Sequence, residues 1–193
     1  MEIKTEYQKL LYCYNSRKFN QVIQKSEKFI KKFGEIPEVF NLIGLSYEML
    51  HKKEEAIKNF EKSLELNPKS VSAMVNLGNN HKDLKNYSIS EEYYVKLIET
   101  DPNYIRAYGN YGNLLRMIND YDGAIKQYKK GIEIYEKNEK QVRNIQLFYY
   151  NLGLAYQSIG DFESTIEQAK IVLKLDPKFT RADHLISGCK KYQ

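Results

Sequence analysis

The sequence of 193 residues lacks the features that mark interdomain linkers, membrane-spanning helices and disordered chains. It contains only four prolines and no long stretch rich in glycine and serine, which argues against a linker between separate domains. No apolar run approaches the roughly 18 residues that a membrane-spanning helix needs, so we expect no membrane partner. Because 42% of the residues are hydrophobic and 28% are charged, we expect the chain to fold rather than to stay disordered.

Cysteine and net charge are also scarce. The two cysteines, Cys13 and Cys189, lie near opposite ends of the sequence, which is typical of unpaired buried thiols in a reducing compartment. The first residues include Glu2 and Glu6, whereas a secretory signal would be basic and then apolar. The net charge is +5, and lysine and glutamate interleave, so no basic tail indicates a nucleic-acid partner. We therefore expect a cytoplasmic protein that binds no nucleic acid.

Patterns that carry catalysis or bind metals are missing as well. The three histidines, His51, His81 and His184, have no second ligand at a helical metal-binding spacing, and His81 is interpreted as a core residue. The cysteines do not have zinc-site spacing, and the glycines do not form a phosphate-binding loop. We expect no catalytic residue, no metal and no cofactor, and we predict that the chain by itself is not an enzyme.

The sequence does contain a fixed period. Gly44, Gly78 and Gly112 each follow an apolar residue and are 34 residues apart (78 − 44 and 112 − 78). Pro68 and Pro102 have the same spacing (102 − 68). A period in the thirties indicates an array of stacked helix pairs, which presents a surface and seldom performs chemistry.

Within each repeat, the apolar residues predict one buried helix face. With Pro37, Val71, Ile105 and Gln146 as position 1, apolar residues recur at positions 4, 7 and 11, and steps of three and four place them on one face. Position 8 is glycine in all four repeats: Gly44, Gly78, Gly112 and Gly153. Glycine inside a helix costs about 1 kcal/mol relative to alanine, so its recurrence predicts the close approach of a neighbouring helix.

These positions resemble the tetratricopeptide repeat (TPR) family, and in particular the TPR arrays of O-GlcNAc transferase-like proteins. The matching features are a large apolar residue at position 4, Leu-Gly at 7–8, Tyr at 11, Ala at 20, Phe or Tyr at 24 and Pro at 32. The resemblance covers 37–179 and implies an all-α fold, a right-handed α-α superhelix (TPR solenoid) of about five helix pairs plus a C-terminal capping helix. The expected segments are a degenerate N-terminal helix pair, four repeats and the capping helix: 1–36, 37–70, 71–104, 105–145, 146–179 and 180–193.

The repeat 105–145 departs from the period. Gly112 and Gly153 are 41 residues apart (153 − 112), seven more than the period, and the extra residues 137–143 are charged and favour helix. We interpret this insertion as about one added turn on each of the two adjoining helices. It is either a solvent-exposed extension or a local protrusion that binds a partner.

Asparagine recurs on the helix face that lines the concave groove in the resembled family. Position 6 is Asn76, Asn110 and Asn151 in three successive repeats; a second column, position 9, holds Asn79 and Asn113. A primary amide donates and accepts hydrogen bonds at once. A column of amides could therefore hold the backbone of an extended peptide, as the asparagine ladder does in the TPR superhelix of O-GlcNAc transferases. The alternative is that these side chains bond only between neighbouring helices.

Charged and aromatic residues extend this candidate surface. Lys82 and Arg116 occupy position 12 and Arg106 position 2, while Glu38 and Glu48 make the first repeat acidic, an arrangement that could orient a charged peptide. Most of the 17 tyrosines fall on core positions, which favours packing over base stacking. The candidate binding residues are Asn41, Asn76, Asn79, Lys82, Arg106, Asn110, Asn113, Arg116, Tyr150 and Asn151.

The function predicted from these features is that of an interaction module. The chain is expected to be a scaffold that binds an extended segment of a protein or peptide partner in its concave groove. The main alternative is the substrate-recognition arm of a larger glycosyltransferase- or sulfotransferase-like enzyme. A helical-repeat protein that binds RNA would need a continuous basic groove, which Glu38, Glu48 and Asp83 interrupt. Exposed end repeats could also stack on copies of themselves.

Overall fold

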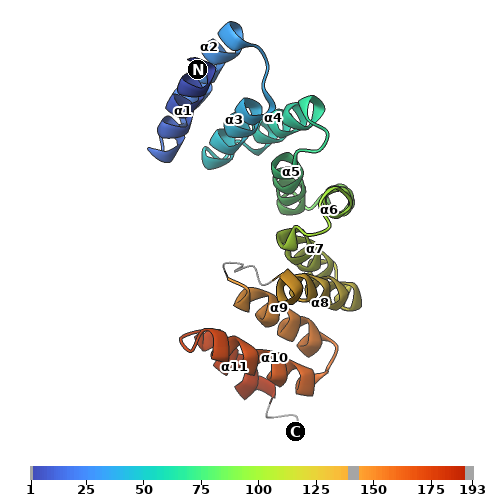
Figure 1. Ribbon diagram of the computed structural model, residues 1–193. Helices are drawn as coiled ribbons and strands as arrows, with labels where there is room; N and C mark the ends of the chain where they lie inside the picture. Colours follow the sequence, from blue (N-terminus) through green and yellow to red (C-terminus); the bar gives the residue numbers. More distant parts are fainter. Residues whose placement is uncertain (1, 139–143, 190–193) are drawn as a thin grey trace. The chain divides into compact units, whose positions relative to one another are not determined.

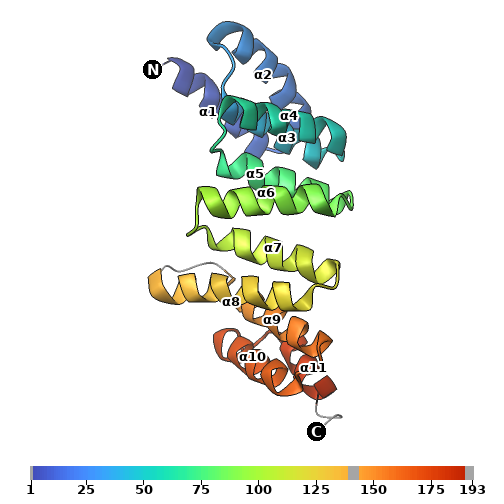
Figure 2. The ribbon, with the colours of Figure 1, turned by 90° about the vertical axis from the view of Figure 1, so that its right-hand side faces the viewer.

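The computed structural model describes residues 2–138 and 144–189 (Figures 1 and 2). Over these residues the backbone forms eleven α-helices and no strand. The predicted all-α fold class is therefore confirmed. The helices fall into two compact units, residues 1–100 and residues 101–193, which we call the N-terminal and the C-terminal unit and treat separately.

The N-terminal unit contains three helix pairs. Its helices are α1 (Glu2–Asn15), α2 (Phe19–Phe33), α3 (Pro37–Met49), α4 (Lys53–Leu66), α5 (Val71–Asp83) and α6 (Tyr87–Thr100). Helices that follow one another in the sequence pack together, and α1 also packs against α3 (Figure 1). Each pair is therefore held by its own short turn and by the pair next to it.

The C-terminal unit contains two helix pairs and a final helix. Its helices are α7 (Ile105–Met117), α8 (Tyr121–Asn138), α9 (Gln146–Ser158), α10 (Phe162–Leu175) and α11 (Thr180–Cys189). In addition to the sequential contacts, α9 packs against both α7 and α11. Leu185 and Cys189 are buried on α11, so this helix covers the apolar face of the pair α9–α10.

The recurring glycine lies against an aromatic ring of the second helix in three of the four repeats. A Cβ atom at Gly44 would lie 2.5 Å from the Phe60 ring. At Gly78 it would lie 2.6 Å from the ring of Tyr94, and the Gly112–Tyr128 pair repeats this arrangement in the C-terminal unit. The predicted close approach of a neighbouring helix is confirmed at these three positions.

Each turn between the two helices of a pair contains one residue in the left-handed conformation. The φ angles are 57° at Arg17, 60° at His51, 64° at Lys85, 65° at Asn119 and 79° at Gly160. These residues share position 15 when the first pair is counted from Ile3. A left-handed residue ends the first helix, and a non-glycine side chain is strained there by roughly 1 kcal/mol.

The insertion lengthens only one of the two helices that adjoin it. Helix α8 has 18 residues, whereas the corresponding α10 has 14, which equals about one added turn. Helix α9 has 13 residues, as α7 does, so the turn predicted for its start is wrong. The reason is local: Asn144 takes a left-handed φ of 69° and Ile145 precedes the helix. Residues 139–143 of the insertion lie outside the described residues.

Candidate functional site

Two of the predicted asparagines meet in the N-terminal unit. The Nδ2 of Asn76 on α5 donates to the Oδ1 of Asn41 on α3 over 3.1 Å, and both side chains are half-buried. The Nδ2 of Asn41 and the Oδ1 of Asn76 have no partner among the described residues of this unit, and neither atom is buried. The pair thus bridges two repeats and still offers one donor and one acceptor to a ligand.

A similar amide pair occurs in the C-terminal unit, where it joins position 9 of one repeat to position 6 of the next. The Nδ2 of Asn151 on α9 donates to the Oδ1 of Asn113 on α7 over 3.0 Å. The Nδ2 of Asn113 and the Oδ1 of Asn151 have no partner among the described residues of that unit. Asn110, half-buried on α7, makes no side-chain hydrogen bond there. The structure therefore has a feature of each interpretation. The amides form hydrogen bonds between neighbouring helices, and they also keep donors and acceptors that a ligand can reach.

The asparagines at position 9 also hold the core tyrosines. The hydroxyl of Tyr94 donates to the Oδ1 of Asn79 over 2.8 Å, and that of Tyr128 donates to the Oδ1 of Asn113 over 2.7 Å. Both tyrosines are fully buried, and burial raises the pKa of Tyr94 far above its usual range and that of Tyr128 to about 12. Asn79 and Asn113 are therefore structural partners of buried hydroxyl groups.

The sequence carries a signal for this role in the residue types at positions 9 and 24. Asparagine stands at position 9 only in the two repeats whose position 24 is tyrosine. The first repeat has Leu45 with Phe60, and the last has Leu154 with Ala169. Pairing an amide with the one aromatic residue that carries a hydroxyl group satisfies that hydroxyl in the core.

A pocket in the C-terminal unit gathers four of the predicted binding residues. It has a volume of about 240 Å³ and lies between α7 and the start of α9. Arg106, Asn110, Asn113 and Asn151 line it, together with Leu147, which is 40% exposed. The pocket thus combines one cation, several amides and an apolar edge.

Phe148, at the base of this pocket, was not predicted. Its ring lies between two glycines: a Cβ atom at Gly109 on α7 would be 2.7 Å from the ring, and one at Gly131 on α8 would be 2.6 Å from it. Neither glycine occupies position 8, so a glycine at an unexpected place in a helix was the sequence signal for this ring. They let the Phe148 ring enter between α7 and α8 and shape the pocket.

The remaining predicted residues, Tyr150, Lys82 and Arg116, belong to neither amide pair. Tyr150 packs against Phe179, with ring centroids 5.1 Å apart, and is therefore part of the core around α11. Lys82 is half-buried on α5. Arg116 lies near Tyr128, whose pKa its charge lowers against the larger effect of burial, and the buried Nε of Arg116 has no partner in the described part of the chain.

Charge differs between the two units along these helices. In the N-terminal unit, the Oε1 of Glu48 accepts a 3.2 Å hydrogen bond from the buried Asn80, and burial raises the pKa of Glu48. Asp83 pairs with Lys53 over 3.2 Å. In the C-terminal unit, positions 2 and 12 of α7 carry Arg106 and Arg116, whereas position 12 in the N-terminal unit is Glu48 on α3 and Lys82 on α5.

No arrangement suited to metal binding occurs within residues 2–138 and 144–189, where no three His, Cys, Asp or Glu side chains gather closely enough to hold an ion. His81 stacks on Tyr93 with ring centroids 5.8 Å apart, and burial lowers its pKa. This histidine is 8% exposed, which agrees with its interpretation as a core residue. Over the same described ranges, no helix combines the length and the apolar character needed to cross a bilayer.

Comparisons with known proteins agree on the type of repeat. Three family profiles, each described as tetratricopeptide repeat, match residues 37–70, 69–137 and 148–179. The general transcriptional corepressor ssn6 of Schizosaccharomyces pombe is 23% identical over 143 residues, which are 74% of this chain and 12% of that protein. The chain thus spans about an eighth of the length of this relative.

Solved structures match nearly the whole chain. A crystal structure of MamA superposes with a TM-score of 0.75 at 20% identity and covers 93% of this chain and 94% of its own. YrrB, described as a TPR protein with an unusual peptide-binding site, matches with a TM-score of 0.72 at 18% identity, covering 91% of this chain and 87% of its own. At these identities the likeness concerns the fold.

Proposed function

Because the chain belongs to the tetratricopeptide repeat family, we propose that it binds an extended segment of a partner protein along the first helices of its repeats. The repeat fold makes the chain a protein-interaction scaffold. The binding helices are α3 and α5 in the N-terminal unit and α7 and α9 in the C-terminal unit. The description of YrrB as peptide-binding supports this kind of ligand.

The observation that carries the proposal is the free edge of each amide pair. In the pair Asn41–Asn76, one Nδ2 and one Oδ1 remain for a ligand, and the pair Asn113–Asn151 leaves the same two groups. In an extended segment the N–H and the C=O of one residue point to the same side, where they match one acceptor and one donor. Each pair can therefore hold one stretch of peptide backbone without reading its side chains.

The pairs are also well suited to bind without rearrangement. Each amide is held by a bond to the next repeat, so it loses little side-chain freedom when a ligand binds. Asn110, which has no such bond within its unit, adds a donor and an acceptor at the edge of the 240 Å³ pocket. A side chain of the bound segment would enter this pocket beside Leu147 and Phe148.

Charge sets the preferred residues of the segment. Arg106 is exposed at the pocket and favours an acidic residue there. The half-buried Glu48 and the exposed Asp83 favour a basic residue at the N-terminal unit. We therefore expect the C-terminal unit to prefer acidic segments and the N-terminal unit to prefer basic segments.

A peptide selection tests the proposal. Extended peptides would be selected from a random library on the wild-type chain, and their affinities would be measured for the triple variant Asn76→Ala, Asn110→Ala, Asn151→Ala. We expect each lost amide bond to reduce affinity by about fivefold, and all three together by about a hundredfold. Asn59→Ala on α4, whose amide bonds only to Glu55 of its own helix, is the matched control and should bind like the wild type. Equal affinity of a folded triple variant and the wild type would contradict the proposal.

The proposal assigns no reaction to the chain, since repeats of this family typically serve as interaction modules. The arm of a larger glycosyltransferase- or sulfotransferase-like enzyme remains the alternative. A reading frame that continues past Gln193 into an α/β domain would favour that alternative, and the groove would then bind the substrate of the enzyme.

A further inference from the structure

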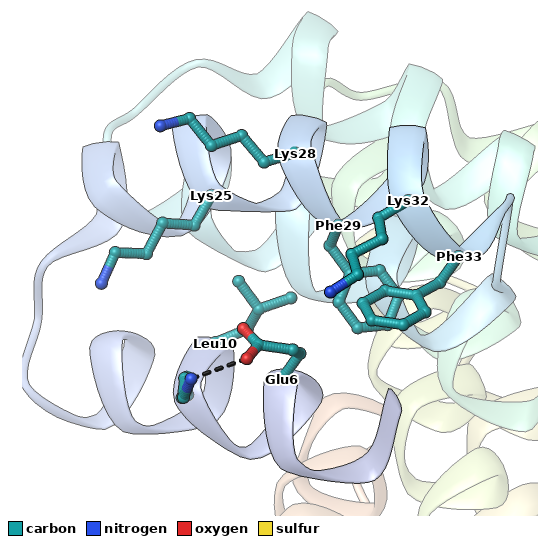
Figure 3. Close-up of a pocket in the computed structure, with 8 residues that line it drawn as sticks. Glu6, Leu10, Lys25, Lys28, Phe29, Lys32 and Phe33 are labelled. Carbon is teal, nitrogen blue, oxygen red and sulfur yellow. Dashed lines mark hydrogen bonds and ion pairs between the residues drawn. The ribbon is translucent and has the colours of Figure 1, made fainter. Parts of the chain in front are cut away.

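A second pocket lies between α1 and α2, away from the asparagines. It has a volume of about 360 Å³ and its floor is apolar, made by Leu10, Phe29 and Phe33 (Figure 3). Leu10 and Phe29 are 2% and 4% exposed, so the floor belongs to the core of the unit. Phe33 packs on Phe29 with ring centroids 4.9 Å apart.

Lysine dominates the rim of this pocket. Lys25, Lys28 and Lys32 follow one another at steps of three and four, so they form a stripe along α2 (Figure 3). Lys9 on α1 also lines the pocket. The stripe is about 10 Å long at the helical rise of 1.5 Å per residue. Four lysines line the pocket against one carboxylate, that of Glu6.

These lysines are only weakly engaged within the chain. Lys9 pairs with Glu6 over 2.6 Å, and Lys32 pairs with Glu2, but all four side chains are more than a third exposed. Exposed ion pairs of this kind contribute little. Lys25 contacts the thiol of Cys13 over 3.4 Å, and Lys28 has no hydrogen bond or ion pair with the described residues. Incoming carboxylates can therefore compete for the whole stripe.

We propose that the pocket between α1 and α2 binds an acidic amphipathic helix of a partner protein. The apolar side of that helix would pack on Leu10, Phe29 and Phe33, and its carboxylates would pair with the lysine stripe. The partner must carry both apolar side chains and carboxylates, because the pocket has an apolar floor and a rim of lysines. Helices α1 and α2 already pack against one further helix, α3, within the chain.

A nucleic acid fits the pocket less well. Its phosphates need a continuous basic track, whereas Glu2 and Glu6 stand beside the lysines. Its backbone also offers no apolar side chain for the floor made by Phe29 and Phe33. The same two glutamates disfavour an anionic membrane surface.

A designed peptide tests this proposal on the full chain. The probe is a fluorescent peptide of about 14 residues, the length at which helices begin to form in water, with leucines on one helix face and glutamates beside them. Fluorescence anisotropy would give its affinity for the wild type and for the charge reversals Lys28→Glu and Lys31→Glu. Lys31 is exposed on the same helix but does not line the pocket, so this variant matches the change in net charge.

We expect Lys28→Glu to weaken binding by about fivefold or more, because it replaces an attraction with a repulsion. Lys31→Glu should remain within about twofold of the wild type. The asparagine triple variant should bind the probe normally, which separates this site from the groove.

Three outcomes would overturn the proposal. The first is an equal loss in Lys28→Glu and Lys31→Glu, or no binding of the probe at all. The second is equal binding of a control peptide with lysines in place of the glutamates. The third is tighter binding of a single-stranded oligonucleotide or of phosphatidylserine vesicles than of the probe, with the same loss in Lys28→Glu.

Discussion

Alanine in place of Gly78 should destabilise the protein, whereas alanine in place of Gly153 should not. Both glycines occupy position 8 of a first helix, so the gain in helix propensity is the same, about 1 kcal/mol. The surroundings differ. A Cβ atom at position 78 would lie 2.6 Å from Cε1 of Tyr94, closer than side-chain carbons approach, whereas one at position 153 would lie 3.3 Å from the end of Leu185.

The size of the effect follows from the freedom of the neighbouring side chain. The Tyr94 ring is fully buried and its hydroxyl donates to Asn79, so it cannot move aside without losing packing and a hydrogen bond. Overpacking costs about 1–3 kcal/mol and the bond about 1 kcal/mol more. After the propensity gain, Gly78→Ala should lose about 2 kcal/mol. Gly153→Ala should be neutral or gain up to about 1 kcal/mol, because only the end of the Leu185 side chain, 3.3 Å away, has to shift by a few tenths of an ångström.

Urea unfolding followed by far-UV circular dichroism measures both variants against the wild type. Hydrogen exchange of the α5 and α6 amides then shows whether the loss is confined to the altered repeat, as expected for arrays stabilised by neighbouring repeats. Gly44→Ala, which faces the fully buried Phe60, should behave like Gly78→Ala. If Gly78→Ala were as stable as Gly153→Ala, the close approach of the ring would not explain why glycine recurs at position 8 of the repeats.

Three further changes test other parts of the account. Asn79→Ala should lose about 1–2 kcal/mol by removing the hydrogen bond that the buried Tyr94 hydroxyl donates to Asn79, and thermal unfolding should show no such loss when Tyr94→Phe is already present. Lys85→Gly should gain up to about 1 kcal/mol at a φ of 64°, whereas Gly160→Ala at 79° should lose about as much; urea midpoints that move the other way would contradict the turn geometry. Burial raises the pKa of Glu48, so its contribution to stability is full below its unfolded pKa and is lost as pH rises through the folded pKa. Glu48→Gln should therefore be more stable than the wild type at pH 7 and equal to it near pH 3, and an equal difference at both pH values would refute this.

The period predicted the repeated contacts well because they depend on residue type at a fixed position. Glycine at position 8 predicted a close neighbour, and the structure places Phe60 or Tyr94 there. One residue type per position is enough for such a prediction. The period could not predict contacts that occur once, such as the Phe148 ring between Gly109 and Gly131, because they depend on residues from three helices.

The candidate binding residues were harder to predict than the fold. Helical spacing placed Asn79 and Asn113 on the groove side, but it could not show that their Oδ1 atoms accept bonds from buried tyrosines. Tyr150 shared position 5 with groove residues and yet packs against Phe179, which lies in the turn just before α11. Spacing gives the face of a helix, whereas the partners on that face depend on the next element.

The central claim is that the asparagine amides hold the backbone of the bound segment. It is tested most directly by comparing a selected peptide with the same peptide N-methylated at one backbone nitrogen after another. For the wild-type chain, methylation at a nitrogen that donates to Asn76 or Asn151 should weaken binding at least about tenfold. For the alanine triple variant, the same methylation should have almost no effect. Equal losses for both proteins would contradict the claim.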